Sequence, residues 1–357
     1  MEIQKRHGIA IAFLAAILFG AAAPIGKPLL VFLNDFQLAG LLYLGAAGGV
    51  ISILIKEKKL TAPWRMRRSD ALKMSGSVLF GGILGPVFLL AGLRIAAAGS
   101  VSLWLNMELV ATAVLGFLFF KDHLSGKGWL ASLGVLTAAI LLAWEGGTAG
   151  FKAGGLITLA CLCWGLDNHL TALIDGVSPA QITFWKGLIA GSVNLSLGVM
   201  MGAYSANIPQ TLSALALGAI AYGLSILLYI TSTRYLGATR AQLIFSSAPF
   251  FGLVIALVFG ESLTLYQGIA FLLFLGSVFL LLKESHTHTH IHQPISHTHI
   301  HYHPDVHHLH EHPENEIETD RHDHLHDHDA LAHDHPHWPD LHHRHGHDDR
   351  SSSGDSE

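Results

Sequence analysis

The sequence predicts an all-α polytopic membrane protein, in which ten transmembrane helices form two inverted five-helix repeats. Hydrophobic residues make up 51% of the 357 residues and charged residues only 13%, whereas a soluble globular chain carries about 25% charged residues. Apolar runs of about 20 residues, the length that crosses a bilayer, follow one another up to residue 283. These observations disfavour a soluble enzyme and a nucleic-acid-binding protein, and two cysteines are too few for a secreted disulfide scaffold.

Charge divides the chain into two parts. Residues 1–283 contain 18 Lys and Arg residues against 10 Asp and Glu residues, a net charge of +8. Residues 284–357 contain 3 Arg residues against 16 acids, together with 23 of the 26 histidines. We therefore expect a membrane-embedded part up to residue 283, followed by a polar tail in water.

Turn residues and charges divide the membrane part into ten apolar segments. These are expected at 8–27, 35–55, 71–93, 99–120, 127–144, 154–174, 180–202, 211–232, 240–260 and 265–283. The first segment also resembles a signal peptide, because Lys5-Arg6 precedes an apolar run that ends in three alanines. Since an internal repeat pairs this segment with a later one, we expect the mature protein to retain it.

The distribution of Lys and Arg predicts the orientation of these segments. With a cytoplasmic N-terminus, fourteen of these residues fall on the cytoplasmic side, and only Lys27, Arg94 and Lys152 fall in outside loops. This bias follows the positive-inside rule. The sequence therefore predicts a multi-pass protein of a bacterial-type cytoplasmic (inner) membrane, with both termini in the cytoplasm.

The membrane part contains two copies of one unit. Residues 93–130 read like residues 233–269, and the pair Phe19-Gly20 matches the pair Trp164-Gly165. Each copy, 1–148 and 149–283, would contain five helices, and an odd number reverses the orientation of the second copy in the membrane. Inverted repeats are typical of secondary transporters, which bind their substrate near mid-membrane between the two halves.

These features resemble the EamA-type carriers of the drug/metabolite transporter superfamily. The resemblance rests on the two aromatic-Gly pairs and on the stretch SSAPFFGLVIALVFGESLT, which is similar to the family's Pro-containing ninth helix with an acid at its outer end. It covers residues 8–283 and implies a ten-helix carrier of small solutes. The first repeat departs from the pattern, because Val110 stands in the place of Pro249 and Asp122 replaces a glutamate.

Glu108 is the first candidate for the transport site. Ionisable side chains within a membrane are costly and therefore mark functional sites, and Glu108 lies nine residues into the segment 99–120. Burial disfavours the charged form of a carboxyl group, as a proton-coupling site requires. Trp104 and Asn106 would add stacking and polar surface beside it. A purely structural, hydrogen-bonded Glu108 is the alternative interpretation.

Asp167, His169 and Lys186 are the other candidates for the transport cavity. Asp167 lies seven residues before the end of the sixth segment, and Lys186 lies six residues after the start of the seventh. At 1.5 Å per residue both lie at a similar depth, so we expect an ion pair, which would serve either transport or helix packing. His169 lies about 200° around the helix from Asp167, so the two should not share one cavity.

Glycines and cysteines in these segments predict packing rather than chemistry. Gly187 and Gly191, like Gly198 and Gly202, are four residues apart, a spacing that allows close contact between helices. The cysteines are only two residues apart and therefore face different sides of a helix. We expect both cysteines to pack as small apolar residues.

The tail alternates His with Thr, Asp or Ile and lacks the aliphatic residues needed for a core, so it should be disordered without metal. Neutral imidazoles suit Zn²⁺, Ni²⁺, Co²⁺ and Cu²⁺, and neighbouring carboxylates can complete the coordination shell. The candidate ligands are His286, His288, His290, His292, His297, His299, His301, His303, His322, His324, His326, His328, His333, His335, His337, His342, His343, His345 and His347.

The sequence favours a secondary transporter over an enzyme. It contains no G-x-x-x-x-G-K-[ST], H-E-x-x-H or G-x-S-x-G motif, and no cofactor is required. The expected partners are a small-molecule substrate, the lipid bilayer and divalent metal ions bound by the tail, without nucleic acid, and a homodimer is compatible with the sequence. Two alternatives stay open: a transporter of Zn, Ni or Co, and a membrane-anchored metal buffer or sensor without transport activity.

Overall fold

The structure is a computed structural model of the whole chain. It describes residues 2–57, 60–120, 126–174, 177–236, 244–282, 286–292, 295–301, 322–328 and 331–337. The chain divides into two compact units, one that contains residues up to Glu284 and one that comprises Ser285–Trp338.

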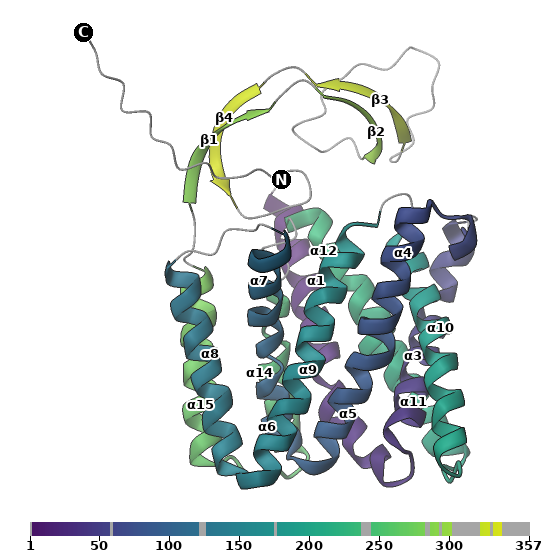
Figure 1. Cartoon of the computed structure of the whole chain (residues 1–357), viewed down its shortest axis with the longest axis vertical. Coiled ribbons are helices and arrows are strands. Elements are labelled where there is room, and N and C mark those ends of the chain that lie inside the picture. Colours follow the sequence, from purple (N-terminus) through teal and green to yellow (C-terminus); the bar gives the residue numbers. More distant parts are fainter. Residues whose placement is uncertain are drawn as a thin grey trace. The chain divides into compact units, whose positions relative to one another are not determined.

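The first half of the larger unit contains five helical segments, several of which are interrupted (Figure 1). In order they are α1 (Glu2–Gly20) continued by α2 (Ala22–Gly26) and the 3₁₀ helix η1 (Lys27–Val31); α3 (Asp35–Glu57); α4 (Arg68–Ser77), the π-helix η3 (Val78–Leu84) and α5 (Gly85–Ile95); α6 (Ala98–Trp104) and α7 (Met107–Phe120); and α8 (Gly126–Glu145). A short 3₁₀ helix, η2 (Pro63–Arg65), precedes α4.

The second half repeats this order. Its segments are α9 (Gly147–Ala172); α10 (Pro179–Met201); α11 (Ile208–Leu217), the π-helix η4 (Gly218–Leu224) and α12 (Ser225–Leu236); α14 (Ala248–Val258); and α15 (Leu265–Leu282). In the described part of the chain, eight helical stretches are long and apolar enough to cross a membrane, and two further apolar helices, Ala248–Val258 and Leu265–Leu280, are shorter. These ten correspond in order to the ten predicted segments, although part of the predicted segment 240–260 lies outside the described residues.

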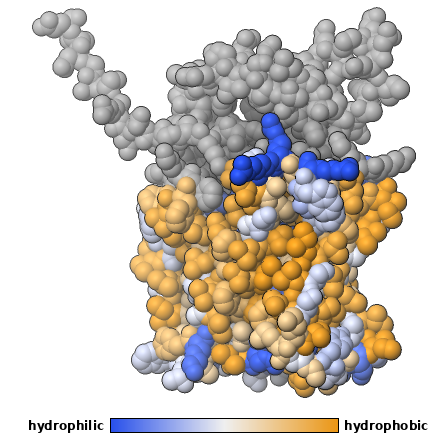
Figure 2. All heavy atoms as spheres, turned by 45° about the vertical axis from the view of Figure 1, so that its right-hand side comes forward, coloured by the Kyte–Doolittle hydropathy of each residue, from blue (hydrophilic) through white to orange (hydrophobic). Residues whose placement is uncertain are grey.

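The surface of the helical unit is suited to lipid. On the face that Figure 2 shows, hydrophobic side chains form a broad band over the helices, and hydrophilic residues gather at its two ends. Large apolar side chains are strongly exposed on this band, among them Leu118 at 62% and Leu272 at 66%. Exposed apolar surface of this extent marks contact with a membrane or a partner, so the chain is a multi-pass membrane protein.

The two halves run in opposite directions. In Figure 1, α4 lies above α5, whereas α11 lies below α12. Both pairs enclose a π-helix at the same place, since a ten-residue helix precedes η3 as well as η4. The structure therefore has the inverted repeat that the sequence predicts.

The π-helix η3 frees backbone groups that neighbouring helices then bind. The amide of Gly85 donates to the carbonyl of Phe80, five residues back. The carbonyl of Gly81 accepts hydrogen bonds from the Tyr43 hydroxyl and from Nε1 of Trp164 at 3.1 Å. Because buried carbonyls need partners, these side chains attach η3 to α3 and α9.

Glycines allow α3 to pack closely against α10. A Cβ on Gly187 would lie 2.7 Å from the carbonyl oxygen of Tyr43, and one on Gly191 would lie 2.7 Å from the amide of Leu44. A Cβ on Gly198 would lie 2.5 Å from the amide of Gln37. The close helix contact predicted from the glycine spacing is confirmed.

The described residues of the smaller unit form four strands of seven residues each: β1 (His286–His292), β2 (Ile295–His301), β3 (His322–His328) and β4 (Leu331–His337). Strand β1 pairs antiparallel with β4, and β2 pairs antiparallel with β3 (Figure 1). The expectation of a disordered segment therefore differs from the structure at these residues. The physical reason is the alternation of histidine with other residues, because a residue type that recurs at every second position falls on one face of a strand.

Candidate functional site

Two of the helical segments are broken near their middle. The fourth segment stops being helical at Leu105 and Asn106, between α6 and α7. The amides of Asn106 and Glu108 there bond three residues back, to Leu103 at 3.1 Å and Leu105 at 3.0 Å. The break places Glu108 in the first turn of α7. The sequence predicts one continuous helix here, from residue 99 to residue 120.

The corresponding segment of the second half has a matching break. Ser246 and Ser247 form a turn immediately before α14, and the amide of Ser247 bonds three residues back to the carbonyl of Ile244 at 3.0 Å. Pro249 lies in the first turn of α14. Proline lacks an N–H group, but the N–H groups of this turn have no acceptor within the helix in any case. Both halves thus interrupt the same helix at an equivalent place.

The two breaks face each other across a small cavity of about 20 Å³. Its lining comes from α1 and from both broken segments: Phe19, Leu105, Asn106, Glu108, Leu109, Phe245, Ser246, Ala248 and Pro249. A space of this size holds about one water molecule. The space between the two breaks is therefore too small for a solute much larger than water.

Polar groups converge on this cavity. Nδ2 of Asn168 on α9 donates to Oε1 of Glu108 at 3.0 Å and lies 3.5 Å from Oγ1 of Thr112. Nδ2 of Asn106 donates to the carbonyl of Leu103 at 2.9 Å, whereas its buried Oδ1 has no hydrogen-bond partner among the described residues. Buried polar atoms without a partner are rare and call for an explanation. Glu108 and Asn106 therefore offer a carboxyl and an amide oxygen at the cavity.

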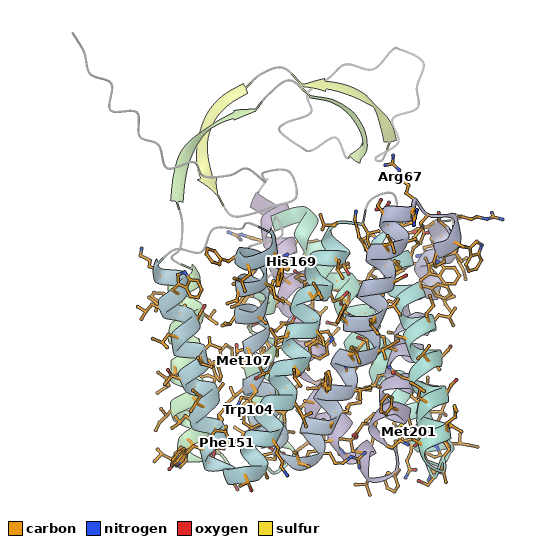
Figure 3. All side chains as sticks on the ribbon, viewed as in Figure 1. Arg67, Trp104, Met107, Phe151, His169 and Met201 are labelled. Carbon is orange, nitrogen blue, oxygen red and sulfur yellow. The ribbon has the colours of Figure 1, made fainter. Side chains whose placement is uncertain are left out.

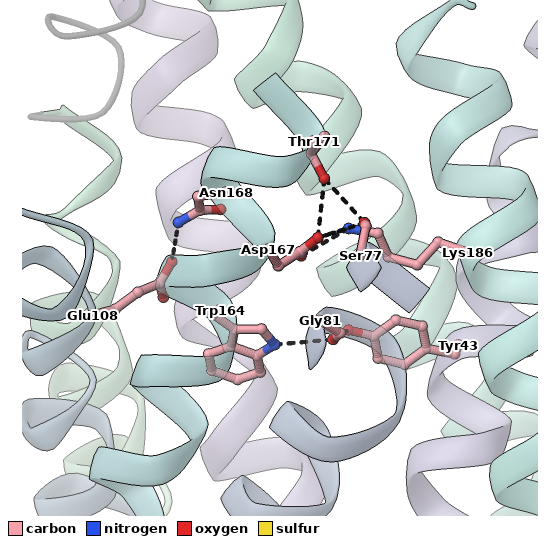
Figure 4. Close-up of polar contacts among 9 residues, drawn as sticks. All are labelled: Tyr43, Ser77, Gly81, Glu108, Trp164, Asp167, Asn168, Thr171 and Lys186. Carbon is pink, nitrogen blue, oxygen red and sulfur yellow. Dashed lines mark hydrogen bonds and ion pairs between the residues drawn. The ribbon is translucent and has the colours of Figure 1, made fainter. Parts of the chain in front are cut away.

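A second polar cluster lies beside η3 (Figure 4). Nζ of Lys186 on α10 contacts both carboxylate oxygens of Asp167 on α9, at 2.7 and 2.8 Å. The hydroxyls of Ser77 and Thr171 also donate to Oδ1 of Asp167, at 2.5 and 2.9 Å. The predicted ion pair is confirmed; it joins α9 to α10, and the hydroxyl of Ser77 adds α4 to the same cluster.

Gly81 makes room for this ion pair. A Cβ at Gly81 would overlap the carboxylate of Asp167, so no larger residue fits at that point of η3. Gly82, the next residue, lies close to α10, because a Cβ there would lie 2.5 Å from Cβ of Ala190 and 3.3 Å from Cγ of Lys186. The π-helix and the ion pair are thus parts of one packed unit.

Trp104 and His169 lie apart from the cavity. Nε1 of Trp104 donates to the carbonyl of Ala139 on α8 at 3.0 Å, and the side chain does not line the cavity. Nε2 of His169 lies 3.0 Å from the carbonyl of Thr112 on α7, on a face of α9 different from that of Asp167. Figure 3 places Trp104 and His169 at different depths of the bundle. The structure therefore brings Glu108 and Asn106 together and keeps Trp104, His169 and the ion pair elsewhere.

The two aromatic-Gly pairs lie close to each other. The rings of Phe19 and Trp164 are in edge contact, with centroids 6.3 Å apart. A Cβ on Gly20 would overlap the carbonyl of Ala248 in α14, and one on Gly165 would lie 3.0 Å from the amide of Thr112 in α7. Each glycine therefore packs against the broken helix of the opposite half.

A larger cavity of about 580 Å³, which the sequence did not predict, opens near the ends of α2, α5, α6 and α14. Glu261 accepts hydrogen bonds from the amides of Ala98 and Gly99, each at 2.8 Å, and lies 3.6 Å from Nζ of Lys27. Arg94 lines the same cavity. The sequence feature that could have predicted this cavity is Glu261, the acid at the outer end of the ninth segment. Its counterpart in the first repeat, Asp122, lies outside the described residues.

No group of three or more His, Cys, Asp or Glu residues that could hold a metal ion is found in the described part of the chain. Cys161 and Cys163 are both free, and Cys161 packs in the core as predicted. Of the predicted metal ligands, His303, His342, His343, His345 and His347 lie outside the described residues. The others occupy positions on the four strands.

Comparisons with known proteins agree with this architecture. An uncharacterized transporter of Methanothermobacter thermautotrophicus is 25% identical over 291 residues, which cover 75% of this chain and 83% of the relative. The uncharacterized transporter YdfC of Bacillus subtilis is 28% identical over 226 residues, which cover 60% of this chain and 73% of the relative.

A solved structure, described only as a crystal structure of a protein, has the same fold. It matches with a TM-score of 0.56 and 17% identity, over 77% of this chain and 95% of its own. The EamA-like transporter family matches residues 6–144 and 152–283, which are the two halves described above. The resemblance inferred from the aromatic-Gly pairs and the ninth segment is confirmed, and the chain belongs to the EamA-like transporter family.

Proposed function

We propose that this protein is a secondary transporter that moves a small polar organic solute across the cytoplasmic membrane. The observation that carries the proposal is the pair of broken helices that face each other at the cavity between the inverted halves. In secondary transporters, interrupted helices expose backbone and polar groups to a substrate near mid-membrane. Glu108 and Asn106 supply these groups here.

The chemistry of the cavity favours a metabolite over a metal ion as cargo. Its polar lining consists of one carboxyl, one amide and one hydroxyl, from Glu108, Asn106 and Ser246, and the rest of the lining is apolar. Such a mixture of a few polar groups on apolar walls suits organic ligands. Transition-metal ions prefer imidazole and thiolate ligands, which the lining of this cavity does not include.

The orientation in the membrane follows from the positive residues at the helix ends. Lys56, Arg65, Arg67, Arg68 and Lys73 surround the connection between α3 and α4, and the positive-inside rule places this connection in the cytoplasm. Reporter fusions after residues 64, 148 and 283 should then report inside, outside and inside, respectively. A tail found outside the cell would contradict this orientation.

The tail is proposed to bind divalent transition metals and to regulate the carrier. Alternating histidines in a polar segment are suitable ligands for Zn²⁺, Ni²⁺, Co²⁺ and Cu²⁺. A transporter that carries the metal itself, and a metal buffer or sensor without transport, are the competing functions. Truncation of the chain after residue 283 distinguishes among the three.

The test compares cells that contain the full chain, the chain truncated after residue 283, or neither, by untargeted measurement of metabolites and metals. We expect the same metabolites to change with the full and the truncated chain, because the cavity lies in the helical unit. Added Zn²⁺ should alter the change only with the full chain. If the truncated chain still changes the metal content of the cells and no metabolite changes, metal is the cargo. No difference among the three strains would contradict transport.

A further inference from the structure

We propose that the basic loop between α3 and α4, residues 56–68, binds the headgroups of anionic phospholipids in the membrane leaflet beside it. Of this loop the structure describes residues 56–57 and 60–68. Binding of this kind is independent of the solute that the carrier moves and of the direction in which the chain crosses the membrane.

The basic loop carries positive charges that no acid among the described residues neutralises. Its exposed basic side chains are Lys56, Arg65, Arg67 and Arg68. None of them forms an ion pair within the described part of the chain. The nearest acids in the sequence have other partners. Glu57 accepts a hydrogen bond from Oγ of Ser178 at 2.5 Å, and Asp70 pairs with Lys73 at 3.1 Å. The positive charges of the loop are therefore available to an anionic ligand.

The positive charges begin where the lipid-facing apolar surface ends. Lys56 directly follows Ile55, whose side chain is strongly exposed in the last turn of α3. Arg68 precedes Leu72, another strongly exposed apolar residue, by one turn on the same face of α4. Figure 3 shows Arg67 at this end of the bundle. The basic side chains thus lie at the level of the lipid headgroups, which border the hydrocarbon region.

Trp64 adds an aromatic side chain to the basic loop. It is 77% exposed, and its ring is in edge contact with that of Trp185 on α10, with centroids 5.9 Å apart. Tryptophan is enriched at membrane–water interfaces, where its ring lies among the headgroups. An exposed tryptophan beside basic residues is therefore suited to the headgroup region rather than to bulk water.

Hydrogen bonds to α10 fix the position of the basic loop. The amide of Thr61 donates to Oε1 of Gln181 at 2.8 Å, and Nε1 of Trp185 donates to the carbonyl of Thr61 at 2.9 Å. The short helix η2 begins two residues after Thr61. Because the backbone is already ordered, headgroup binding has to order only the basic side chains, which lowers its entropic cost.

The chemistry of the basic loop favours a lipid over a free anion. Guanidinium groups bind phosphate oxygens through paired, charge-assisted hydrogen bonds, and both kinds of ligand offer such oxygens. The exposed apolar side chains of Ile55, Trp64 and Leu72 adjoin the basic residues along the chain, and acyl chains can contact them, whereas a free phosphate has no such group. Clusters of basic residues next to a transmembrane helix are typical of anionic-lipid binding.

The test measures phospholipid binding to the detergent-purified full-length protein by native mass spectrometry, with phosphatidylglycerol as the anionic probe and phosphatidylcholine as the neutral one. We expect the unaltered protein to bind phosphatidylglycerol more tightly. Arg67→Gln combined with Arg68→Gln should weaken this binding by about tenfold or more, since each Lys or Arg near a membrane surface contributes a factor of roughly five. Binding of phosphatidylcholine should not change.

Two further double variants separate the charge of this loop from charge elsewhere and from folding. Lys127→Gln combined with Lys152→Gln removes two exposed basic side chains outside the loop and should leave phosphatidylglycerol binding unchanged. Arg67→Lys combined with Arg68→Lys keeps both charges and should retain the preference for phosphatidylglycerol. Retention in the lysine variant also shows that the loop tolerates substitution at both positions.

Three results would overturn the proposal. Equal affinity of the unaltered protein for phosphatidylglycerol and phosphatidylcholine would exclude recognition of the anionic headgroup. Equal losses in the two glutamine double variants would show that the basic loop is not the binding surface. Displacement of phosphatidylglycerol by millimolar glycerol 3-phosphate would identify a site for free phosphate compounds instead of a lipid surface.

Discussion

Glu108→Gln should abolish the accumulation of solute that a pH gradient drives, while exchange of solute across the membrane continues. Glu108 is the one lining residue of the cavity between the broken helices that can take up and release a proton. A charged carboxyl near mid-membrane is costly, so a carrier that changes its conformation with Glu108 protonated couples solute movement to protons. Glutamine keeps the size of the side chain and an oxygen that accepts from Asn168, but it carries no exchangeable charge.

The measurement uses proteoliposomes loaded with the solute identified by the cell comparison. Counterflow at equal pH should persist in the Glu108→Gln protein, whereas uptake driven by a pH gradient should fall to background. Glu145→Gln, at the end of α8, is the matched control and should behave as the unaltered protein does. If pH-driven uptake survives in the Glu108→Gln protein, Glu108 is a structural residue.

Asp167→Asn and Lys186→Gln should each destabilise the protein more than the two substitutions together. The side chains of Lys186 and Asp167 are only 14% and 11% exposed. Removal of one partner of a buried ion pair leaves an uncompensated charge, which costs about 3–5 kcal/mol. The double variant retains neutral hydrogen-bonding groups and no buried charge, so part of the stability should return.

Thermal unfolding of the detergent-solubilised protein measures these effects. Asp35→Asn serves as the control, because Asp35 and Arg94 are more exposed, at 24% and 39%, and Arg94 also donates to the carbonyls of Leu30 and Leu33. Exposed pairs contribute about 0–1 kcal/mol. Losses that simply add in the double variant would show that Asp167 and Lys186 act independently.

Hydrophobic length and charge placement were sufficient to predict the helical segments and their order. They were also sufficient for the pair of Asp167 with Lys186, because the depth of a residue in a membrane helix follows from its distance to the helix end. Neither the hydrophobic length of a segment nor the depth of a residue within it depends on side-chain packing. Both are therefore visible in a single sequence.

The breaks in the fourth and ninth segments could not be predicted in this way. Leu105 and Asn106 interrupt a segment whose composition and length are those of one continuous helix, and a proline marks only the second break, at Pro249. A helix break leaves backbone N–H and C=O groups without partners in the helix. Whether these groups find other hydrogen-bond partners depends on residues that are far apart in the sequence. The direction of Trp104 toward α8 likewise depends on the packing of α8, so its expected place beside Glu108 was not found.

The tail shows how composition and periodicity can give opposite predictions. A scarcity of aliphatic residues predicted disorder, whereas histidine at every second position is typical of a strand with one distinct face. The structure follows the periodicity at 286–292, 295–301, 322–328 and 331–337. The disorder prediction considered only the burial of apolar area and not the pairing of backbone groups along a hairpin.

The two π-helices bear on how the gene arose. A π-helix results when one extra residue is accommodated within an α-helix, and η3 and η4 each contain seven residues, each after a ten-residue helix in the third segment of its half. Separate origins would require two insertions at equivalent sites, whereas one insertion in an ancestral five-helix protein, before its duplication and fusion, accounts for both. That ancestor would have assembled as an antiparallel pair of identical chains, each with its own copy of the bulge.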